Sequence, residues 1–597
     1  MLIGKKVRTY LKNLFKVQEL HRRLRWPLLS IAVGIVAGVG AITFDWLLHL
    51  FLKYFIHLPT GYIEPVPIPA GTPTWTAPHF WGRWLLLIIP TLGGLVSGLI
   101  VFLIAPEAEG DGTNAMIESF HQRGGFVRKR VPFLKILSSA ITIGSGGSAG
   151  KEGPISQIGS GFGSCLASAL HLRPRDRRIL MLAGAAAGIG AIFRAPLGAA
   201  LFAPEVLYRD TEFESEAILP CLTSSIVAYS IFTNVYGRQA LFFPGHVDIS
   251  IPTELVPYTL FGVVCALVGY FYVHWFYGLR DKFFNKLPLP NHFKPAIGGF
   301  LLGCVALFYP QIMAGGYGWI QYALEGKFLW HTMFILAILK IVVTSFTISS
   351  GGSGGVFGPS LFMGAMLGGA FGFLGHQLAP QWVINPTSYV LVGMGAFLGG
   401  VGKIPIASII MLCEMSSSYT LLVPLMLVTT IAFLCLWNTT LYEKQVATRM
   451  ASPAHFQRIA SGLLERMFVY QAVNNRPVEL IPESMPFEQL VRTVTNSPDH
   501  YFPVIDQQGK MTGILSINDI RGLLFEEAIS HLIVAKDVAT PNVVRLFWNE
   551  TLKQALDKFN VINVDELPVV KEDSPDQIIT MLSKRDIISF YYQKIGV

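Results

Sequence analysis

Two distant segments of the chain share a template whose residue types could bind an anion. The first is Gly150-Lys-Glu-Gly-Pro154 and the second is Gly355-Val-Phe-Gly-Pro359, and each follows a glycine-rich stretch and precedes an apolar run. Proline favours the first turn of a helix, and flexible glycines ahead of it leave backbone N–H groups free at the positive end of the helix dipole. Each copy is therefore a candidate anion site.

Glu152 gives the first copy a titratable group that the second copy lacks. An ionised carboxylate at such a site is itself an anion, so it can occupy the place of a bound anion, and protonation would release it. Burial disfavours the charge of a carboxylate while N–H donors favour it, so a proton-operated gate near neutral pH is physically available. The alternative for this residue alone is a glutamate that only complements the helix dipole.

The duplication continues beyond this template. Residues 183–205 align without a gap on residues 392–414, and the alignment pairs Glu205 with Glu414. Matching glycines and prolines interrupt the apolar runs of both copies. Duplicated membrane units with interrupted helices predict a substrate site near the bilayer midplane, where the two units meet.

The composition places most of the chain in lipid. Mean hydropathy is +0.48, 52% of the residues are hydrophobic and 14% are charged, whereas about a quarter of a soluble chain is ordinarily charged. Several apolar runs are short or rich in glycine, and such segments are tolerated only where they line a cavity or lie buried in protein. The sequence therefore predicts an α-helical polytopic membrane protein with two inverted repeats, built around a pathway.

Charge distribution predicts the topology. A basic segment at 1–25 precedes the first apolar run, which by the positive-inside rule predicts a cytoplasmic amino terminus in a multi-pass protein of the inner or plasma membrane. A nucleic-acid partner is not expected, because the basic residues cluster beside membrane segments. We expect the membrane domain at 26–452, with repeat halves at about 80–235 and 255–450.

The end of the chain changes to the pattern of a soluble α/β module. A linker is predicted at 453–475, followed by two similar halves at 476–528 and 536–597. Each half contains a strand, a turn, a second strand and a helix that opens at Ser-x-x-Asp. The tail is therefore a second duplication.

This tail resembles the paired cystathionine-β-synthase-type (CBS) domains that form cytoplasmic regulatory modules. The resemblance implies that the Ser-x-x-Asp residues can hold an adenine nucleotide; these are Ser516, Asp519, Ser583 and Asp586. The alternative is that each serine caps its helix and each aspartate complements the helix dipole.

The membrane part resembles the CLC family of chloride channels and proton/chloride antiporters, from Trp26 to Met450. The resemblance rests on both Gly-x-x-Gly-Pro templates, on the 183–205 segment and on Ala105-Pro-Glu-Ala-Glu-Gly-Asp-Gly-Thr-Asn114. It implies a homodimer in lipid, in which each subunit holds its own pore between two inverted halves. It also implies a voltage-gated type of transport protein for chloride or another small anion, with no enzymatic activity and no required cofactor.

The resemblance assigns roles to particular residues. Glu152 would be the gate, and the anion-binding residues would be Asp111, Gly112, Thr113, Gly153, Val356, Phe357 and Tyr442. Backbone N–H groups of the second template and the tyrosine hydroxyl would hold a central anion. Such donors carry no full charge, so an anion can bind and still leave, as conduction requires.

Asp111 departs from the family pattern, which usually has serine at this position. An ionised aspartate in the pore would repel an anion, so it must be protonated, turned away or paired. Thr113 and Asn114 offer neutral donors in place of the lost hydroxyl. These residue types do not select one anion over another.

Val206 is the second departure, because antiporters of the family carry a proton-delivering glutamate there. Glu205 is adjacent, but one residue along a helix turns a side chain by about 100°. We therefore expect a passive, gated anion channel, with a proton-coupled antiporter as the alternative because water chains can replace a side chain. A CBS-regulated divalent cation channel is a remote alternative that would need acidic residues converging in the bilayer.

Overall fold

The computed structural model describes residues 2–66, 75–245, 252–455, 464–474, 477–497, 499–521, 532–562 and 564–595. The chain divides into two compact units, Met1–Ala454 and His455–Val597. Parts of the predicted linker and of both predicted CBS halves lie outside the described residues, so their boundaries stay predictions.

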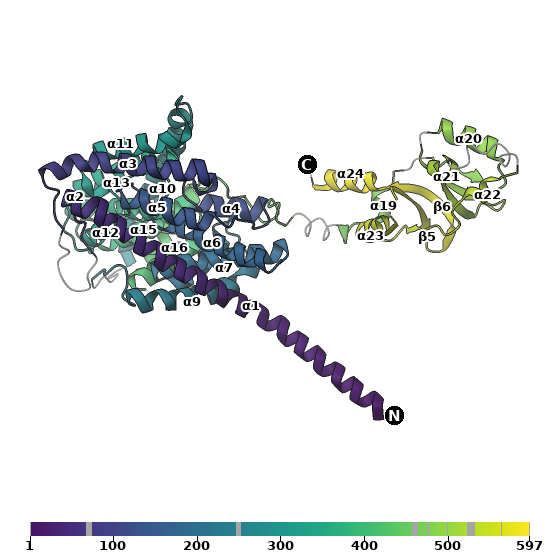
Figure 1. Ribbon diagram of the computed structural model, residues 1–597, viewed down its shortest axis with the longest axis horizontal. Helices are drawn as coiled ribbons and strands as arrows, with labels where there is room; N and C mark the ends of the chain where they lie inside the picture. Colours follow the sequence, from purple (N-terminus) through teal and green to yellow (C-terminus); the bar gives the residue numbers. More distant parts are fainter. Residues whose placement is uncertain are drawn as a thin grey trace. The chain divides into compact units, whose positions relative to one another are not determined.

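The first unit is a bundle of helices (Figure 1). These are α1 (Leu2–Phe51), α2 (Leu58–Thr60), α3 (Phe80–Ile104), α4 (Thr113–Gln122), α5 (Val131–Gly144), α6 (Glu152–Ala169), α7 (Pro174–Phe193), α8 (Pro196–Glu205), α9 (Ser215–Tyr236), α10 (Leu255–Leu279), α11 (Lys294–Ala306), α12 (Tyr317–Leu324), α13 (Trp330–Ser349), α14 (Phe357–Leu378), α15 (Ser388–Gly402), α16 (Pro405–Ser416) and α17 (Leu422–Cys435).

Six helical segments among the described residues are long and apolar enough to cross a membrane: Arg25–Thr60, Phe80–Ile104, Ser215–Tyr236, Leu255–Phe284, Trp330–Ser349 and Phe357–Leu378. Among the shorter apolar helices, α5 lies between two of these segments in sequence, and α15, α16 and α17 follow the last of them. Helices of 10 to 17 residues fall short of the roughly 20 residues that span a bilayer. The prediction of a membrane domain with interrupted helices is confirmed.

The helices of the first unit form two equivalent series. The order α3 to α9 recurs as α11 to α17, and the short 3₁₀ turn before α4 (Pro106–Ala108) recurs before α12 (Pro310–Ile312). The two long helices α1 and α10 also match, because each continues into a π-helical turn, at Leu52–His57 and Arg280–Phe284. We infer that the first half begins with α1, before the predicted start at residue 80.

Close helix packing is repeated in the same way. A Cβ atom on Gly159 would collide with the carbonyl oxygen of Gly184, and the reverse also holds, so α6 and α7 touch through their backbones. Gly364 and Gly393 make the same reciprocal contact between α14 and α15. Small residues permit such approach in membrane proteins, where packing drives helix association. Each template helix is thereby fixed against the helix that follows it.

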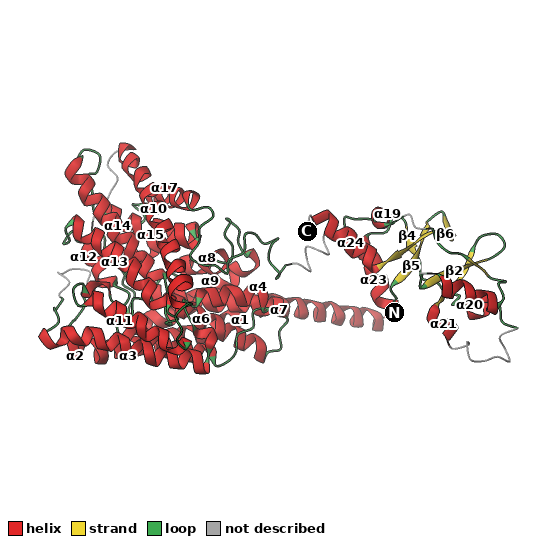
Figure 2. Cartoon of the chain, turned by 90° about the horizontal axis from the view of Figure 1, so that it is seen from above, coloured by secondary structure: helices red, strands yellow, loops and turns green. Residues whose placement is uncertain are grey.

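The described residues of the second unit form two small sheets of equal topology (Figure 2). Its elements are α19 (Val469–Ala472), β1 (Ile481–Pro482), α20 (Phe487–Asn496), β2 (Tyr501–Ile505), β3 (Met511–Ser516), α21 (Ile517–Arg521), α22 (Ala535–Val538), β4 (Leu546–Phe547), α23 (Leu552–Ile562), β5 (Glu566–Lys571), β6 (Ser574–Ser583) and α24 (Lys584–Ile595). In each sheet a parallel pair is followed by an antiparallel pair. The predicted duplicated α/β tail is confirmed.

Candidate anion site

The two glycine-rich templates meet in the interior of the first unit. The Gly150 N–H donates to the Gly355 carbonyl at 2.7 Å, and the Gly355 N–H donates to the Gly150 carbonyl at 2.8 Å. This two-bond bridge holds the start of α6 next to the start of α14. The N-termini of two long helices, which carry positive partial charge, are thus brought together.

Glu152 connects the two templates. Its side chain belongs to the first turn of α6, is only 1% exposed, and accepts a hydrogen bond through Oε2 from the Gly358 N–H of α14 at 3.1 Å. The other oxygen, Oε1, has no hydrogen-bond partner in the described part of the chain. The carboxylate of the first template therefore sits on the helix N-terminus of the second.

Phe357 and Val356 lie in a tightly packed surrounding. Each is 2% exposed, and the Phe357 ring packs against Phe193 and Phe202 with centroid distances of 5.2 and 5.8 Å. These aromatic contacts fix the first turn of α14, so its backbone N–H groups are held in place independently of any ligand.

Gly153 and Gly112 are needed for close approach. A Cβ atom on Gly153 would collide with the Asp111 carbonyl oxygen, and a Cβ atom on Gly112 would lie 2.6 Å from the Gly153 carbonyl oxygen. Gly112 also has a φ of 81°, in the region that favours glycine. The loop before α4 therefore lies directly on the first turn of α6.

Asp111 is paired with neutral donors. Its Oδ1 accepts the Asn114 backbone N–H at 3.0 Å, and its Oδ2 lies 3.4 Å from the Asn114 side-chain amide nitrogen. This arrangement caps the start of α4. Asp111 thus hydrogen-bonds neutral groups of its own loop, and the Asn114 amide expected to face an anion is used by Asp111.

Thr113 and Tyr442 are far apart in the sequence and lie close together in the membrane unit. Both are buried, at 2% and 1% exposure, and the Tyr442 phenol lies close to the Thr113 side chain. The Tyr442 ring also lies against Gly402, since a Cβ atom there would be 3.4 Å from the ring. Tyr442 is therefore buried inside the membrane unit.

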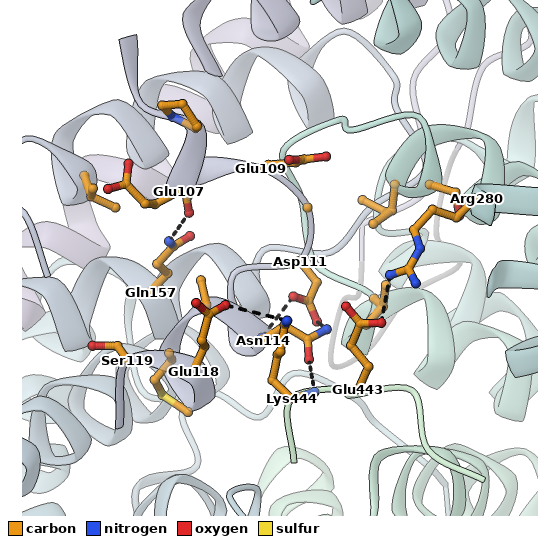
Figure 3. Close-up of a pocket in the computed structure, with 18 of the residues that line it drawn as sticks. Glu107, Glu109, Asp111, Asn114, Glu118, Ser119, Gln157, Arg280, Glu443 and Lys444 are labelled. Atoms are coloured by element: carbon orange, nitrogen blue, oxygen red, sulfur yellow. Dashed lines mark hydrogen bonds and ion pairs between the residues drawn. The ribbon is translucent and has the colours of Figure 1, made fainter. Parts of the chain in front are cut away.

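A cavity of about 810 Å³ reaches Asp111 and Val356. Figure 3 shows its charged wall, in which Glu118 points toward Lys444 and Arg280 toward Glu443. Because these acidic and basic side chains form pairs, the wall carries both positive and negative charge. Among the residues that the structure describes, His, Cys, Asp and Glu side chains form no group of three or more suited to a metal ion.

Two buried lysines, which sequence reasoning missed, stabilise the loops of this site. Neither ammonium group is exposed, and each donates to two backbone carbonyls of the loop before a short helix. Lys135 donates to Ala108 and Gly110 at 2.9 and 2.8 Å, and Lys340 donates to Ile312 and Ala314 at 2.8 and 2.7 Å. An alignment of 106–113 on 310–317, extended to these lysines, would have revealed them.

Glu205 and Glu414, which the sequence alignment pairs, cap each other's helices. Glu205 accepts the N–H groups of Ile406 and Ala407 at the start of α16, at 3.0 and 2.7 Å. Glu414 accepts those of Leu197 and Gly198 at the start of α8, at 3.1 and 2.7 Å. Both carboxylates are thus occupied by helix N-termini.

The Ser-x-x-Asp residues of the tail form helix caps. The backbone N–H and hydroxyl of Ser516 donate to one Asp519 oxygen at 2.8 and 2.7 Å. Ser583 donates to Asp586 in the same way, at 3.1 and 2.6 Å. In the second half the Ser583 hydroxyl also accepts the Asp586 N–H at 3.1 Å, which is the capping contact expected as the alternative.

Comparison with known proteins agrees with this geometry. The profile of the voltage gated chloride channel family matches residues 93–436, and that of the CBS domain matches residues 470–526. The ClcB-like protein of Ralstonia nicotianae is 32% identical over 351 residues, which make up 58% of this chain and 80% of the relative.

Two further proteins extend the comparison. The H⁺/Cl⁻ exchange transporter ClcA of Cronobacter sakazakii is 29% identical over 69% of this chain and 87% of its own. The crystal structure of a eukaryotic CLC transporter superposes on 95% of this chain and 98% of its own with a TM-score of 0.58, at 18% identity, which shows a shared fold. With the family profile covering more than half of its length, the chain belongs to the CLC family of voltage gated chloride channels and carries a C-terminal CBS region.

Proposed function

We propose that this chain is a gated chloride channel in which Glu152 is the gate. The observation that carries the proposal is the contact between the Glu152 carboxylate and the Gly358 N–H at the start of α14. An ionised carboxylate there takes the place that the helix N-terminus offers to chloride. A protonated one loses its charge and with it most of this attraction, so we expect acid to open the pathway.

The remaining donors suit a transported halide. Backbone N–H groups at Val356 and Phe357, with the hydroxyls of Tyr442 and Thr113, would form what we call the central site. All are neutral donors, and they bind an anion without trapping it. Asp111 would lower the affinity of this site, since its carboxylate lies in the same loop, and Lys135 would partly offset that charge.

Passive conduction is favoured by the surroundings of Val206. This side chain is fully buried and cannot carry a proton, and its carbonyl accepts a hydrogen bond from Gln445. The neighbouring Glu205 uses both carboxylate oxygens to cap α16. A carboxylate that holds two N–H groups is poorly suited to repeated proton exchange with water.

Proton-coupled antiport is the alternative function. It is favoured by one observation, that the relative ClcA is named as an H⁺/Cl⁻ exchange transporter. A buried water chain could then replace the missing glutamate. The divalent cation channel does not fit membership in this family.

The assembly belongs to the same proposal. Apolar side chains on α9 and α17 are widely exposed in the single chain, among them Leu219 at 74%, Val235 at 61% and Val423 at 57%. We propose that this face is covered in a homodimer within the inner or plasma membrane. The amino terminus and the CBS pair would be cytoplasmic, and the pair would bind an adenine nucleotide.

Chloride flux from liposomes with simultaneous recording of external pH tests the channel assignment. Purified protein should release chloride down its gradient, with no proton movement beyond that of protein-free liposomes when the membrane potential is clamped by valinomycin and potassium. Proton movement in fixed proportion to chloride would identify an antiporter. Absence of chloride flux from folded protein would reject anion transport altogether.

A further inference from the structure

Tyr317 occupies the position in the second half that Thr113 occupies in the first. The segment 106–113 aligns on 310–317 without a gap. In both segments a glycine with positive φ, Gly112 at 81° and Gly316 at 74°, is followed by the first residue of a short helix. The repeat therefore places a hydroxyl-bearing side chain at the start of α4 and at the start of α12.

The Tyr317 hydroxyl lies beside the Glu152 contact. A Cβ atom built on Gly358 would be 2.5 Å from this hydroxyl and 2.9 and 3.0 Å from the two Glu152 carboxylate oxygens. The hydroxyl and the carboxylate therefore flank the same point on the first turn of α14. Glycine at 358 is what leaves room for both.

One atom of each group lacks a hydrogen-bond partner. The Tyr317 hydroxyl and Glu152 Oε1 are both buried and have no hydrogen-bond partner among the residues that the structure describes. A buried hydroxyl without a partner is unfavourable. The energetic cost of the unpaired hydroxyl is explained if it binds a ligand after the Glu152 side chain has moved away.

The Tyr317 ring is held in position by its surroundings. It lies over Gly315, the counterpart of Asp111, where a Cβ atom would be 2.5 Å from the ring. The Lys151 ammonium is 5.8 Å from the ring centroid, and the Phe242 ring lies on it at 6.4 Å. The missing side chain at 315 thus makes space for a ring whose hydroxyl faces α14.

We propose that the Tyr317 hydroxyl is a ligand of the halide that takes the place of the Glu152 carboxylate at the Gly358 N–H; this position is called the gate site. The inference rests on the proposed function. The gate site binds chloride or bromide through two neutral donors, one from each of two elements. Tyr317 serves it as the hydroxyl of Tyr442 serves the central site, and it competes with Glu152 for the occupant.

Halide binding to full-length protein with the gate site vacated tests this assignment. The background is Glu152→Ala, and chloride binding is measured by isothermal titration calorimetry at fixed ionic strength. Adding Tyr317→Phe removes one neutral hydrogen bond, and we expect the affinity of one halide site to fall about three- to tenfold. The matched control is Tyr389→Phe, which removes another buried, unpaired hydroxyl that is stacked on Tyr258 at 4.2 Å.

The outcomes separate this inference from the function on which it rests. Weaker binding with Tyr317→Phe, unchanged binding with Tyr389→Phe and retained chloride flux would support the gate site. Equal affinity in the Tyr317 variant and its background would overturn it, as would an equal loss in the Tyr389 control. Absence of flux and of any halide binding in the Glu152→Ala background would instead reject the proposed function. Thermal unfolding of each variant establishes that it is folded.

Discussion

The two halves of the membrane unit share their scaffold and differ in the side chains at matched positions of their loops and templates. Both halves hold a loop with a buried lysine, and both start a long helix at a Gly-x-x-Gly-Pro template. At the matched positions, the first half has Asp111, Thr113 and Glu152, and the second has Gly315, Tyr317 and Phe357. Duplication therefore supplies equivalent helix ends, and these three positions are where we propose that the halves differ in function.

The largest effect is expected from substituting Glu152, and the equivalent Phe357 of the second half should not show it. Glu152→Gln removes the charge that competes with chloride, so flux at neutral pH should rise about tenfold and lose its dependence on pH, because one pH unit changes the ionised fraction of a carboxylate up to tenfold. Chloride efflux from liposomes between pH 5 and 8 measures this. The control is Phe357→Leu at the equivalent position, which should retain the pH dependence. If Glu152→Gln keeps a normal pH dependence, the gate lies elsewhere.

Asp111 gives the second effect, because only the first half carries an acid in this loop. Asp111→Asn keeps an oxygen that can accept the Asn114 N–H and removes the negative charge, so chloride affinity should rise about three- to tenfold at the effective dielectric of a protein interior. Equilibrium chloride binding measures the change. Glu118→Gln is the control, since Glu118 lines the same cavity but pairs with Arg123 and Lys444. Unchanged affinity in Asp111→Asn would mean that its charge is not felt by the anion.

The reciprocal caps should respond equally in the two halves. Glu205→Gln and Glu414→Gln each replace a carboxylate that holds two N–H groups by an amide with one acceptor oxygen, and each should lower the free energy of unfolding by about 1–2 kcal/mol. Thermal unfolding in detergent measures the loss. Proton movement during chloride flux should not change in either variant. Altered proton movement in the Glu205 variant would instead indicate that Glu205 carries protons.

The smallest effect concerns the second duplication. Ser516→Ala and Ser583→Ala each remove a helix-cap hydroxyl in the full chain, and each should cost about 0.5–1 kcal/mol. If the Ser-x-x-Asp residues also hold a nucleotide, the same variants should abolish any rise in melting temperature caused by an adenine nucleotide. A nucleotide-dependent rise that survives both substitutions would place that ligand at other residues.

The duplicated templates, the membrane class and the CBS tail could be predicted from the sequence because each leaves a local pattern of glycine, proline or alternating apolar residues. The partners of Glu152, Glu205 and Glu414 could not, because each carboxylate meets the N–H groups of a helix in the other half. Such pairing depends on how the inverted halves interlock. The role of Tyr317 was hidden for the same reason, and only its alignment with Thr113 gave a signal.

The central claim is that the carboxylate of the first half and a halide compete for the helix N-terminus of the second half. Bromide located by anomalous diffraction in the protein and in Glu152→Gln, at neutral pH and equal bromide concentration, tests it most directly. We expect a bromide peak at the Gly358 N–H in Glu152→Gln only, with the glutamate carboxylate in that place in the unsubstituted protein. Equal bromide peaks at Gly358 in both proteins would contradict the account.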